Sequence, residues 1–84
     1  MNEGKIRVMD LDEKVFDIIK DVKGRYFDER RNLITDGFIS SFELIALILK
    51  LERSFDIKIP IERIEPESFN SVEQIAAFMS ELIN

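Results

Sequence analysis

The sequence predicts an all-α fold, a small bundle of three main helices plus one short helix. Apolar residues recur at helical spacing in three separate segments, and a serine of the kind that starts helices precedes two of them. The one stretch that alternates like a strand, residues 55–59, has no partner of similar character. Since 84 residues are close to the smallest chain that one hydrophobic core can hold together, we expect a single domain.

The first helix is predicted after a loosely ordered arm at residues 1–9. Its apolar side chains recur at spacings of four, three, one and three, which places them on one stripe of a helix: Leu11, Val15, Ile18, Ile19 and Val22. Gly24 follows as a plausible C-terminal stop.

A long loop is predicted between the first and second helices, over residues 25–39. Its sequence is polar, and its apolar residues have no clean period, so we expect them to pin the loop to the core: Tyr26, Phe27, Leu33, Ile34, Phe38 and Ile39. A basic cluster in and beside the loop is interrupted by acidic residues and is interpreted as solvated: Lys23, Arg25, Arg30 and Arg31. A loop of this length in a compact domain often marks a functional segment.

The second helix is predicted from Ser41 to Phe55 and is apolar on two faces. One face is the expected core stripe, with Leu44, Leu47, Ile48, Leu51 and Phe55. The opposite face carries Phe42, Ile45, Ala46 and Leu49. Either the long loop covers this second face or it is offered to a partner.

The rest of the chain predicts an extended connection, a short helix and a final helix. Pro60 can occupy the first position of a short helical turn that ends at Ile64, before Pro66. The final helix opens at Ser71, with Gln74 three residues on to complete a capping box. Its core stripe is Val72, Ile75, Ala76, Met79, Leu82 and Ile83.

Composition excludes several classes of function. Without cysteine or histidine the chain lacks a thiolate nucleophile, the commonest general base and the commonest metal ligand, so we expect no metal site. Carboxylates such as Glu43, Glu62 and Glu65 occupy ordinary exposed helix positions with no catalytic partner readable from the sequence, and solvated faces explain them better, so we do not expect an enzyme. The formal charge of −5 disfavours nucleic acid, and no apolar stretch approaches the ~20 residues that span a bilayer. We therefore expect a cytoplasmic monomer without membrane insertion.

Two adjacent serines lie at the start of the second helix, and only one of them is needed to cap it. Ser40 with Glu43 fits the S-x-x-E capping box, in which the serine hydroxyl accepts a hydrogen bond from an otherwise unpaired amide. Ser41 is then spare. Composition and spacing alone would leave it as a surface serine.

The segment DGFISSF, residues 36–42, resembles the modification motif of acyl carrier proteins. A second block typical of that family, L-E-x-x-F-x-I-x-[IV]-P, fits residues 51–60. The resemblance extends over nearly the whole chain, so residues 10–84 are identified as a single carrier domain.

The resemblance implies that Ser41 is the attachment point of 4′-phosphopantetheine, which a phosphopantetheinyl transferase takes from coenzyme A. The thiol of that group then carries an acyl or aminoacyl group as a thioester, so a chain without cysteine can serve thioester chemistry. The implied partners are an enzyme that loads this group and a downstream synthase or transferase. We expect them to dock on residues of the second and short helices: Phe42, Glu43, Ile45, Ala46, Leu49 and Ile64.

The sequence departs from the family pattern in two ways. Most members have aspartate immediately before the modified serine, whereas this chain has Ser40. Its second helix is also more apolar and less acidic than that of fatty-acid synthase carriers. The first departure removes a charge next to the attachment point, so we expect it to shift transferase preference. The second favours a specialised free-standing carrier in lipid, polyketide or nonribosomal peptide biosynthesis, or in amino-acid activation. The alternatives are the housekeeping fatty-acid synthase carrier and an unmodified helical interaction module with a carrier-like fold.

Overall fold

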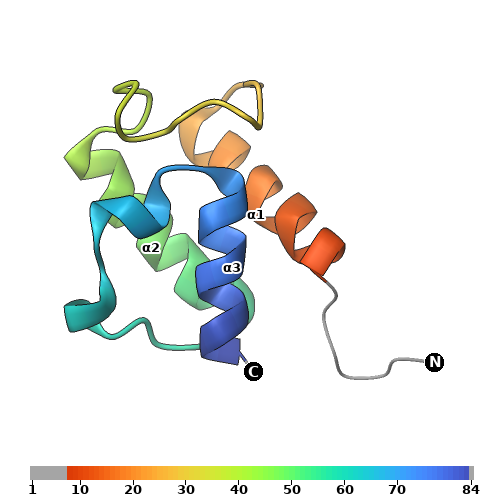
Figure 1. Ribbon diagram of the computed structural model, residues 1–84, viewed down its shortest axis with the longest axis vertical. Helices are drawn as coiled ribbons and strands as arrows, with labels where there is room; N and C mark the ends of the chain where they lie inside the picture. The colour runs from red at the N-terminus through yellow and green to blue at the C-terminus, as the bar shows by residue number, and fades with distance from the viewer. Residues whose placement is uncertain (1–7, 84) are drawn as a thin grey trace.

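The computed structural model describes the backbone of residues 8–83 and the side chains of residues 10–83. Helices are the only regular elements in that part of the chain (Figure 1). They are α1 (Val8–Lys23), α2 (Ser41–Phe55), the 3₁₀ helices η1 (Ile61–Arg63) and η2 (Pro66–Phe69), and α3 (Val72–Ile83). The predicted all-α class is therefore confirmed. Of the predicted arm, residues 8 and 9 belong to α1, and residues 1–7 lie outside the described part.

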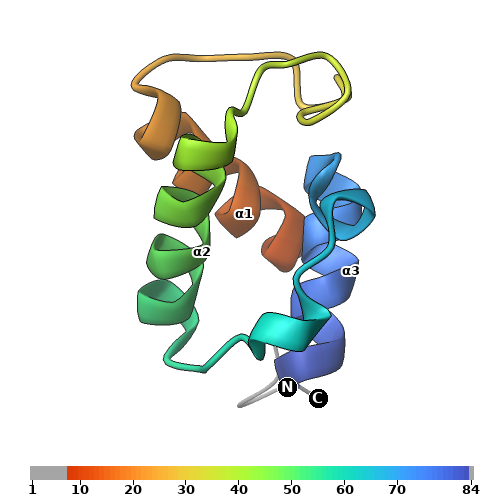
Figure 2. The same ribbon diagram turned by 90° about the vertical axis from the view of Figure 1, so that its left-hand side faces the viewer.

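The three long helices form a bundle in which α1 packs against both α2 and α3. Figures 1 and 2 show α2 and α3 running in the same direction and α1 crossing them in the opposite sense. The loop over residues 24–40 closes the end of the bundle at which α2 and α3 begin (Figure 2). This end of the molecule carries the two adjacent serines.

The core contains the predicted apolar stripes together with Ile59, Phe69 and Phe78, which belong to no predicted stripe. Side chains with no exposed surface come from every long helix, from the loop and from η2: Val15, Ile19, Leu33, Leu47, Leu51, Phe69, Ile75 and Met79. Burial of each such side chain contributes about 1.5–3 kcal/mol relative to its exposure to water. None of the described helices is long and apolar enough to cross a membrane.

The connection between α1 and α2 is a long loop, as predicted, and its apolar side chains hold it to the bundle. Gly24 ends α1 with a φ of 72°, in the left-handed region that favours glycine. Phe27, Leu33, Phe38 and Ile39 are buried. Tyr26 was expected among these anchors, and this expectation is wrong. Its ring is exposed and meets the Phe16 ring edge-on at the surface of α1.

Asn70, between η2 and α3, fastens the middle of this loop from the other side. Its Oδ1 accepts hydrogen bonds from Ile34 N at 2.8 Å and from Thr35 N at 3.0 Å. Its main-chain oxygen accepts a third from Leu33 N at 2.6 Å. These bonds satisfy loop amides that no regular element would pair.

The segment from α2 to α3 differs in detail from the prediction. The extended connection was predicted over residues 55–59, but Phe55 is the last residue of α2 and Asp56 has a left-handed backbone, so it begins later than expected. Residues 57–60 belong to no regular element, and Glu52 Oε2 accepts a hydrogen bond from Ile59 N at 2.8 Å. Pro60 is the residue before η1 rather than its first residue, and a second 3₁₀ helix, η2, was not predicted. Pro66 therefore begins an element instead of only bounding one. α3 begins one residue later than predicted, at Val72. Of the capping box expected there, the described residues show one half, in which Ser71 Oγ accepts from Gln74 N at 3.0 Å.

Candidate modification site and docking surface

Ser40 caps α2, as predicted. Its backbone is extended, with φ −78° and ψ 168°. Its Oγ accepts a hydrogen bond from Glu43 N at 3.1 Å, and its own N donates to Glu43 Oε1 at 2.9 Å. This reciprocal pair is a complete capping box and fixes the first turn of α2.

Ser41 is the first residue of α2, and its side chain is exposed. Within residues 8–83 its hydroxyl has no hydrogen-bond partner. It lies at the positive end of the helix dipole, beside amides of the first turn that have no intrahelical acceptor. The hydroxyl is therefore accessible, and its surroundings suit an attached anion.

Glu43 does more than complete the cap, because its carboxylate also contacts α1. Lys23 Nζ donates to Glu43 Oε1 at 3.1 Å and to Oε2 at 2.9 Å. The hydrogen bond from Ser40 N and the bonds from Lys23 hold the pKa of Glu43 below its usual value. Lys23, expected in a solvated cluster, is only 14% exposed, so this interpretation is wrong for Lys23.

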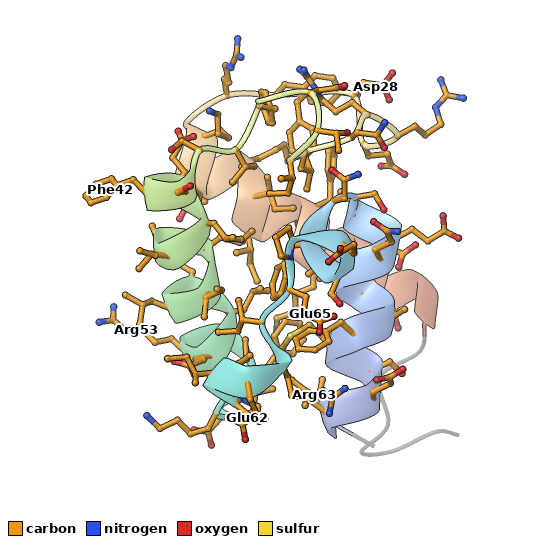
Figure 3. The ribbon with its side chains drawn as sticks, turned by 60° about the vertical axis from the view of Figure 1, so that its left-hand side comes forward. Asp28, Phe42, Arg53, Glu62, Arg63 and Glu65 are labelled. Carbon is orange, nitrogen blue, oxygen red and sulfur yellow. The ribbon has the colours of Figure 1, made fainter. Side chains whose placement is uncertain are left out.

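The apolar face of α2 opposite the core is open to solvent. Phe42 is 84% exposed, Ile45 59% and Leu49 53%, and Ala46 between them is also exposed. Figure 3 shows the Phe42 side chain pointing away from the bundle. The alternative that the long loop covers this face is therefore wrong. The face ends at a shallow cavity of about 410 Å³ between the end of α2 and the segment that follows, lined by Leu49, Glu52, Arg53, Asp56, Ile57 and Lys58.

No protein-family model matches the chain, but several known proteins with the same name are similar to it. The D-alanyl carrier protein of Lactococcus lactis subsp. lactis (strain IL1403) is 37% identical over 76 residues, covering 84% of this chain and 94% of that protein. The D-alanyl carrier protein of Streptococcus uberis (strain ATCC BAA-854 / 0140J) is 32% identical over 84 residues, covering 90% and 99%. That of Lactobacillus acidophilus (strain ATCC 700396 / NCK56 / N2 / NCFM) is 27% identical over 78 residues, with the same coverage.

The chain belongs to the acyl carrier protein family. It is a non-catalytic carrier, and its prosthetic group is a covalent 4′-phosphopantetheine. Carriers of this kind work with a phosphopantetheinyl transferase and with enzymes that load them. The exposed, unpaired hydroxyl of Ser41 fits the need of this group for an accessible serine oxygen.

Two of the residues expected to dock partners of the carrier are placed differently from the rest. Ile64 is partly buried and packs against the core, and Glu43 is engaged by Ser40 and Lys23. The exposed apolar residue of η1 is instead Ile61, which the sequence analysis did not single out. A helix of three residues has no periodic pattern that would assign its faces.

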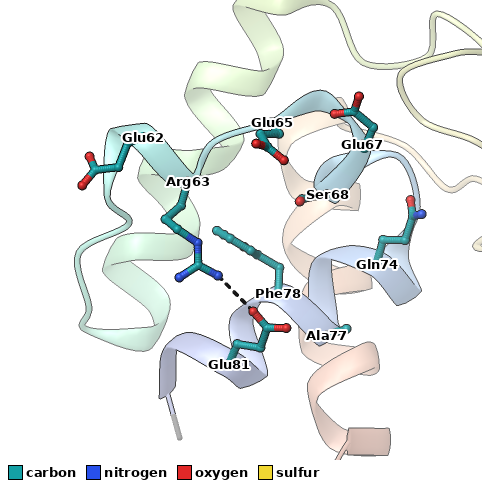
Figure 4. Close-up of a pocket in the computed structure, with 9 residues that line it drawn as sticks. All are labelled: Glu62, Arg63, Glu65, Glu67, Ser68, Gln74, Ala77, Phe78 and Glu81. Carbon is teal, nitrogen blue, oxygen red and sulfur yellow. Dashed lines mark hydrogen bonds and ion pairs between the residues drawn. The ribbon is translucent and has the colours of Figure 1, made fainter.

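A second cavity of the carrier, of about 360 Å³, lies between the 3₁₀ helices and α3 (Figure 4). Arg63 Nη2 bonds Glu81 Oε1 at 2.9 Å, and the Arg63 guanidinium lies 5.5 Å from the centre of the Phe78 ring. Glu62 and Glu65, at its edge, are exposed. Their exposure agrees with the expected solvated positions, whereas Glu43, interpreted in the same way, is bonded to Ser40 and Lys23.

Proposed function

We propose that Ser41 is the residue of this carrier that bears 4′-phosphopantetheine. The observation that carries the proposal is its exposed hydroxyl at the first position of a capped helix, with no partner among residues 8–83. Ser40, the neighbouring candidate, uses its Oγ to accept from Glu43 N. Modification of Ser40 would therefore disturb the cap, whereas modification of Ser41 costs no hydrogen bond to residues 8–83.

In this proposal the chain supplies a nucleophile and a favourable place for the phosphodiester. Ser41 Oγ forms a bond to the phosphorus atom of coenzyme A that bears pantetheine, and the pyrophosphate bond of coenzyme A breaks. The adenosine bisphosphate half leaves with the electron pair of that bond, and the hydroxyl proton passes to the transferase or to solvent. The first-turn amides and dipole of α2 favour the resulting negative charge by about 0.3–1 kcal/mol. When bound, 4′-phosphopantetheine supplies the thiol that the chain lacks.

The carried group that we propose is D-alanine. The support is that three relatives with 27%, 32% and 37% identity, each matched over most of its length, are all named D-alanyl carrier proteins. This is an aminoacyl group, one of the two kinds of cargo considered from the sequence. Roles in lipid, polyketide or nonribosomal peptide synthesis have no comparable support.

Partner enzymes are proposed to hold the carrier by the exposed face of α2, formed by Phe42, Ile45, Ala46 and Leu49. The side chains of this face contribute little to the core, and their apolar area next to the modified serine suits a partner with an apolar contact surface. Because this face is apolar and has no acidic residue, it does not suit enzymes that recognise carriers by clusters of acidic residues.

The attachment site is tested by intact-protein mass after incubation with coenzyme A, magnesium and a broad-specificity transferase. The wild-type chain and Ser40→Ala are expected to gain the mass of one phosphopantetheinyl group, and Ser41→Ala none. Ser40→Ala is the matched control, because it removes the adjacent hydroxyl. Labelling of Ser41→Ala would show that another residue is modified.

The cargo is tested on the modified carrier with ATP and an enzyme that adenylates D-alanine. We expect one alanyl group to be added, released by hydroxylamine as a thioester would be, and absent from Ser41→Ala. Equal loading with L-alanine or with fatty acids by their own activating enzymes would remove the support for D-alanine as the specific cargo.

The exposed face of α2 also favours a second candidate, an unmodified interaction module. This candidate predicts no labelling of the wild-type chain, but stoichiometric binding of a protein partner that Leu49→Glu weakens. Labelling of Ser41 excludes it as the sole function.

A further inference from the structure

We propose that Lys23 is a positioning residue for the modification of Ser41, because its ammonium fastens the end of the loop and the first turn of α2 to the end of α1. The inference rests on the proposed role of Ser41 and adds a residue that the acyl-carrier resemblance does not assign. Lys23 lies 18 positions before the serine in sequence, in a different helix.

Three hydrogen bonds satisfy the Lys23 ammonium. Its Nζ donates to Phe38 O at 2.6 Å, to Glu43 Oε1 at 3.1 Å and to Glu43 Oε2 at 2.9 Å. An ammonium has three donors, so these acceptors match its full capacity. With the side chain 14% exposed, solvent competes weakly with these bonds. One group thus joins α1, the end of the loop and α2.

The contacts continue from Glu43 to the residues on either side of Ser41. The Glu43 oxygen that accepts the longer bond from Lys23 also accepts from Ser40 N at 2.9 Å, and Ser40 Oγ accepts from Glu43 N at 3.1 Å. Because Ser41 lies between these two capping residues, its backbone is held from both sides. Through Glu43, Lys23 ties this turn to the end of α1.

Phe38 secures the loop side of the same arrangement. Its ring is buried, with Lys23 Nζ at 4.5 Å, the Arg31 guanidinium at 4.3 Å and the Arg25 guanidinium at 5.2 Å from its centre. Cations over an aromatic face are attracted by it. The carbonyl of Phe38 therefore offers Lys23 a fixed acceptor two residues before the cap.

We expect the contacts of Lys23 with Phe38 and Glu43 to affect the rate of modification more than the binding of the transferase. The first turn of a helix lacks intrahelical partners for its amides and frays readily. Small displacements of a reacting atom lower the rate of a bound complex strongly. Lys23 is outside the exposed face of α2 that we propose for docking, so its loss is expected to lower kcat and to leave KM nearly unchanged.

The experiment compares transferase kinetics of Lys23→Met with those of Lys50→Met. Lys50 pairs with Asp21 and so also bridges α2 and α1, but farther along α2 from Ser41. At a temperature where circular dichroism shows all variants folded, Lys23→Met is expected to lower kcat at least fivefold with KM within twofold. Lys50→Met is expected to match the wild type, and Lys23→Arg, which keeps a cationic donor, to recover most of the rate.

Hydrogen exchange distinguishes local loosening of the first turn of α2 from a general loss of stability. The Glu43 amide, bonded to Ser40 Oγ, should exchange faster in Lys23→Met than in Lys50→Met relative to core amides such as that of Leu51. Equal kcat in Lys23→Met and Lys50→Met would overturn the inference while the proposed function stands. Absence of labelling in the wild-type chain would instead refute the proposed function, and the inference with it.

Discussion

Replacing Asn70 with alanine should destabilise the protein because it removes the side-chain acceptor that fastens the loop between α1 and α2. Two hydrogen bonds to Asn70 Oδ1 are lost, from Ile34 N at 2.8 Å and from Thr35 N at 3.0 Å, together with the long 3.4 Å bond from Asn70 Nδ2 to Thr35 Oγ1. Each such bond contributes a net value of about 1 kcal/mol. Thr35 is exposed and its amide regains water, whereas Ile34 is partly buried, so we expect a loss of about 1.5–2 kcal/mol. The bond to the main-chain oxygen of Asn70 is unaffected by the substitution.

Urea unfolding followed by circular dichroism measures this loss, and for a chain of this size the melting temperature should fall by about 10 °C. Asn70→Asp is the matched control, because its carboxylate keeps the acceptor and sacrifices only the long 3.4 Å contact from Nδ2 to Thr35 Oγ1. It should retain stability within about 0.5 kcal/mol of the wild type. A loss below about 0.5 kcal/mol in Asn70→Ala, or equal losses in both variants, would refute the reasoning.

Three further variants test local features of the fold by urea unfolding. Burial and the nearby charges of Glu73 and Glu29 raise the pKa of Asp12 above 3.8, so its ionised form opposes folding. Asp12→Asn should therefore stabilise the protein by about 0.5 kcal/mol at pH 7 and by less as the pH falls towards 3.8, and destabilisation at pH 7 would contradict this. Gly37 has a φ of 73°, and a Cβ atom added there would meet nothing within 4 Å. Gly37→Ala should therefore lower the free energy of unfolding by about 1 kcal/mol through backbone strain alone, and Gly37→Asn by less; unchanged stability in Gly37→Ala would disprove the strain. The pKa of Glu43 is lowered, so its charge stabilises the fold above pH 4.5 and less as the pH falls through its folded value. Glu43→Gln should destabilise the protein by about 1 kcal/mol at pH 7 and by progressively less as the pH falls below 4.5, and a pH-independent difference would exclude this role of the charge.

The parts of the fold that the sequence predicts well depend on local patterns. The bounds of α2 follow from an S-x-x-E cap at Ser40 and an apolar repeat that continues to Phe55, and the structure has the same bounds. Gly24 ends α1 because the left-handed conformation required there is easily adopted by glycine. In each case the residues that determine the element lie within a few positions of it.

The features that the sequence analysis missed depend on contacts between distant positions. Lys23 meets Glu43 across 20 positions, and Asn70 meets Ile34 across 36, so no local pattern indicates either contact. Tyr26 fails as a predicted anchor for a related reason, since its loop position leaves open which side of the chain faces the bundle. η2 has only four residues, too few for a helical period.

For the candidate site, Ser40 could be assigned from local physics, whereas Ser41 could not. A capping box identifies Ser40 by spacing alone, and the structure confirms both of its hydrogen bonds. Ser41 differs from an ordinary surface serine through its family motif and its position at the first residue of α2, and neither is a contact. An attachment site needs accessibility rather than partners, so hydrogen-bond geometry alone gives it no distinguishing mark.

In our proposal 4′-phosphopantetheine is attached to one oxygen of this carrier, Oγ of Ser41. The most direct measurement is fragment mass spectrometry of the peptide spanning both serines, after coexpression with a broad-specificity transferase. We expect every fragment containing phosphopantetheine to include Ser41, and fragments ending at Ser40 to have their unmodified mass. Phosphopantetheine on Ser40, or an unmodified peptide throughout, would contradict the proposal.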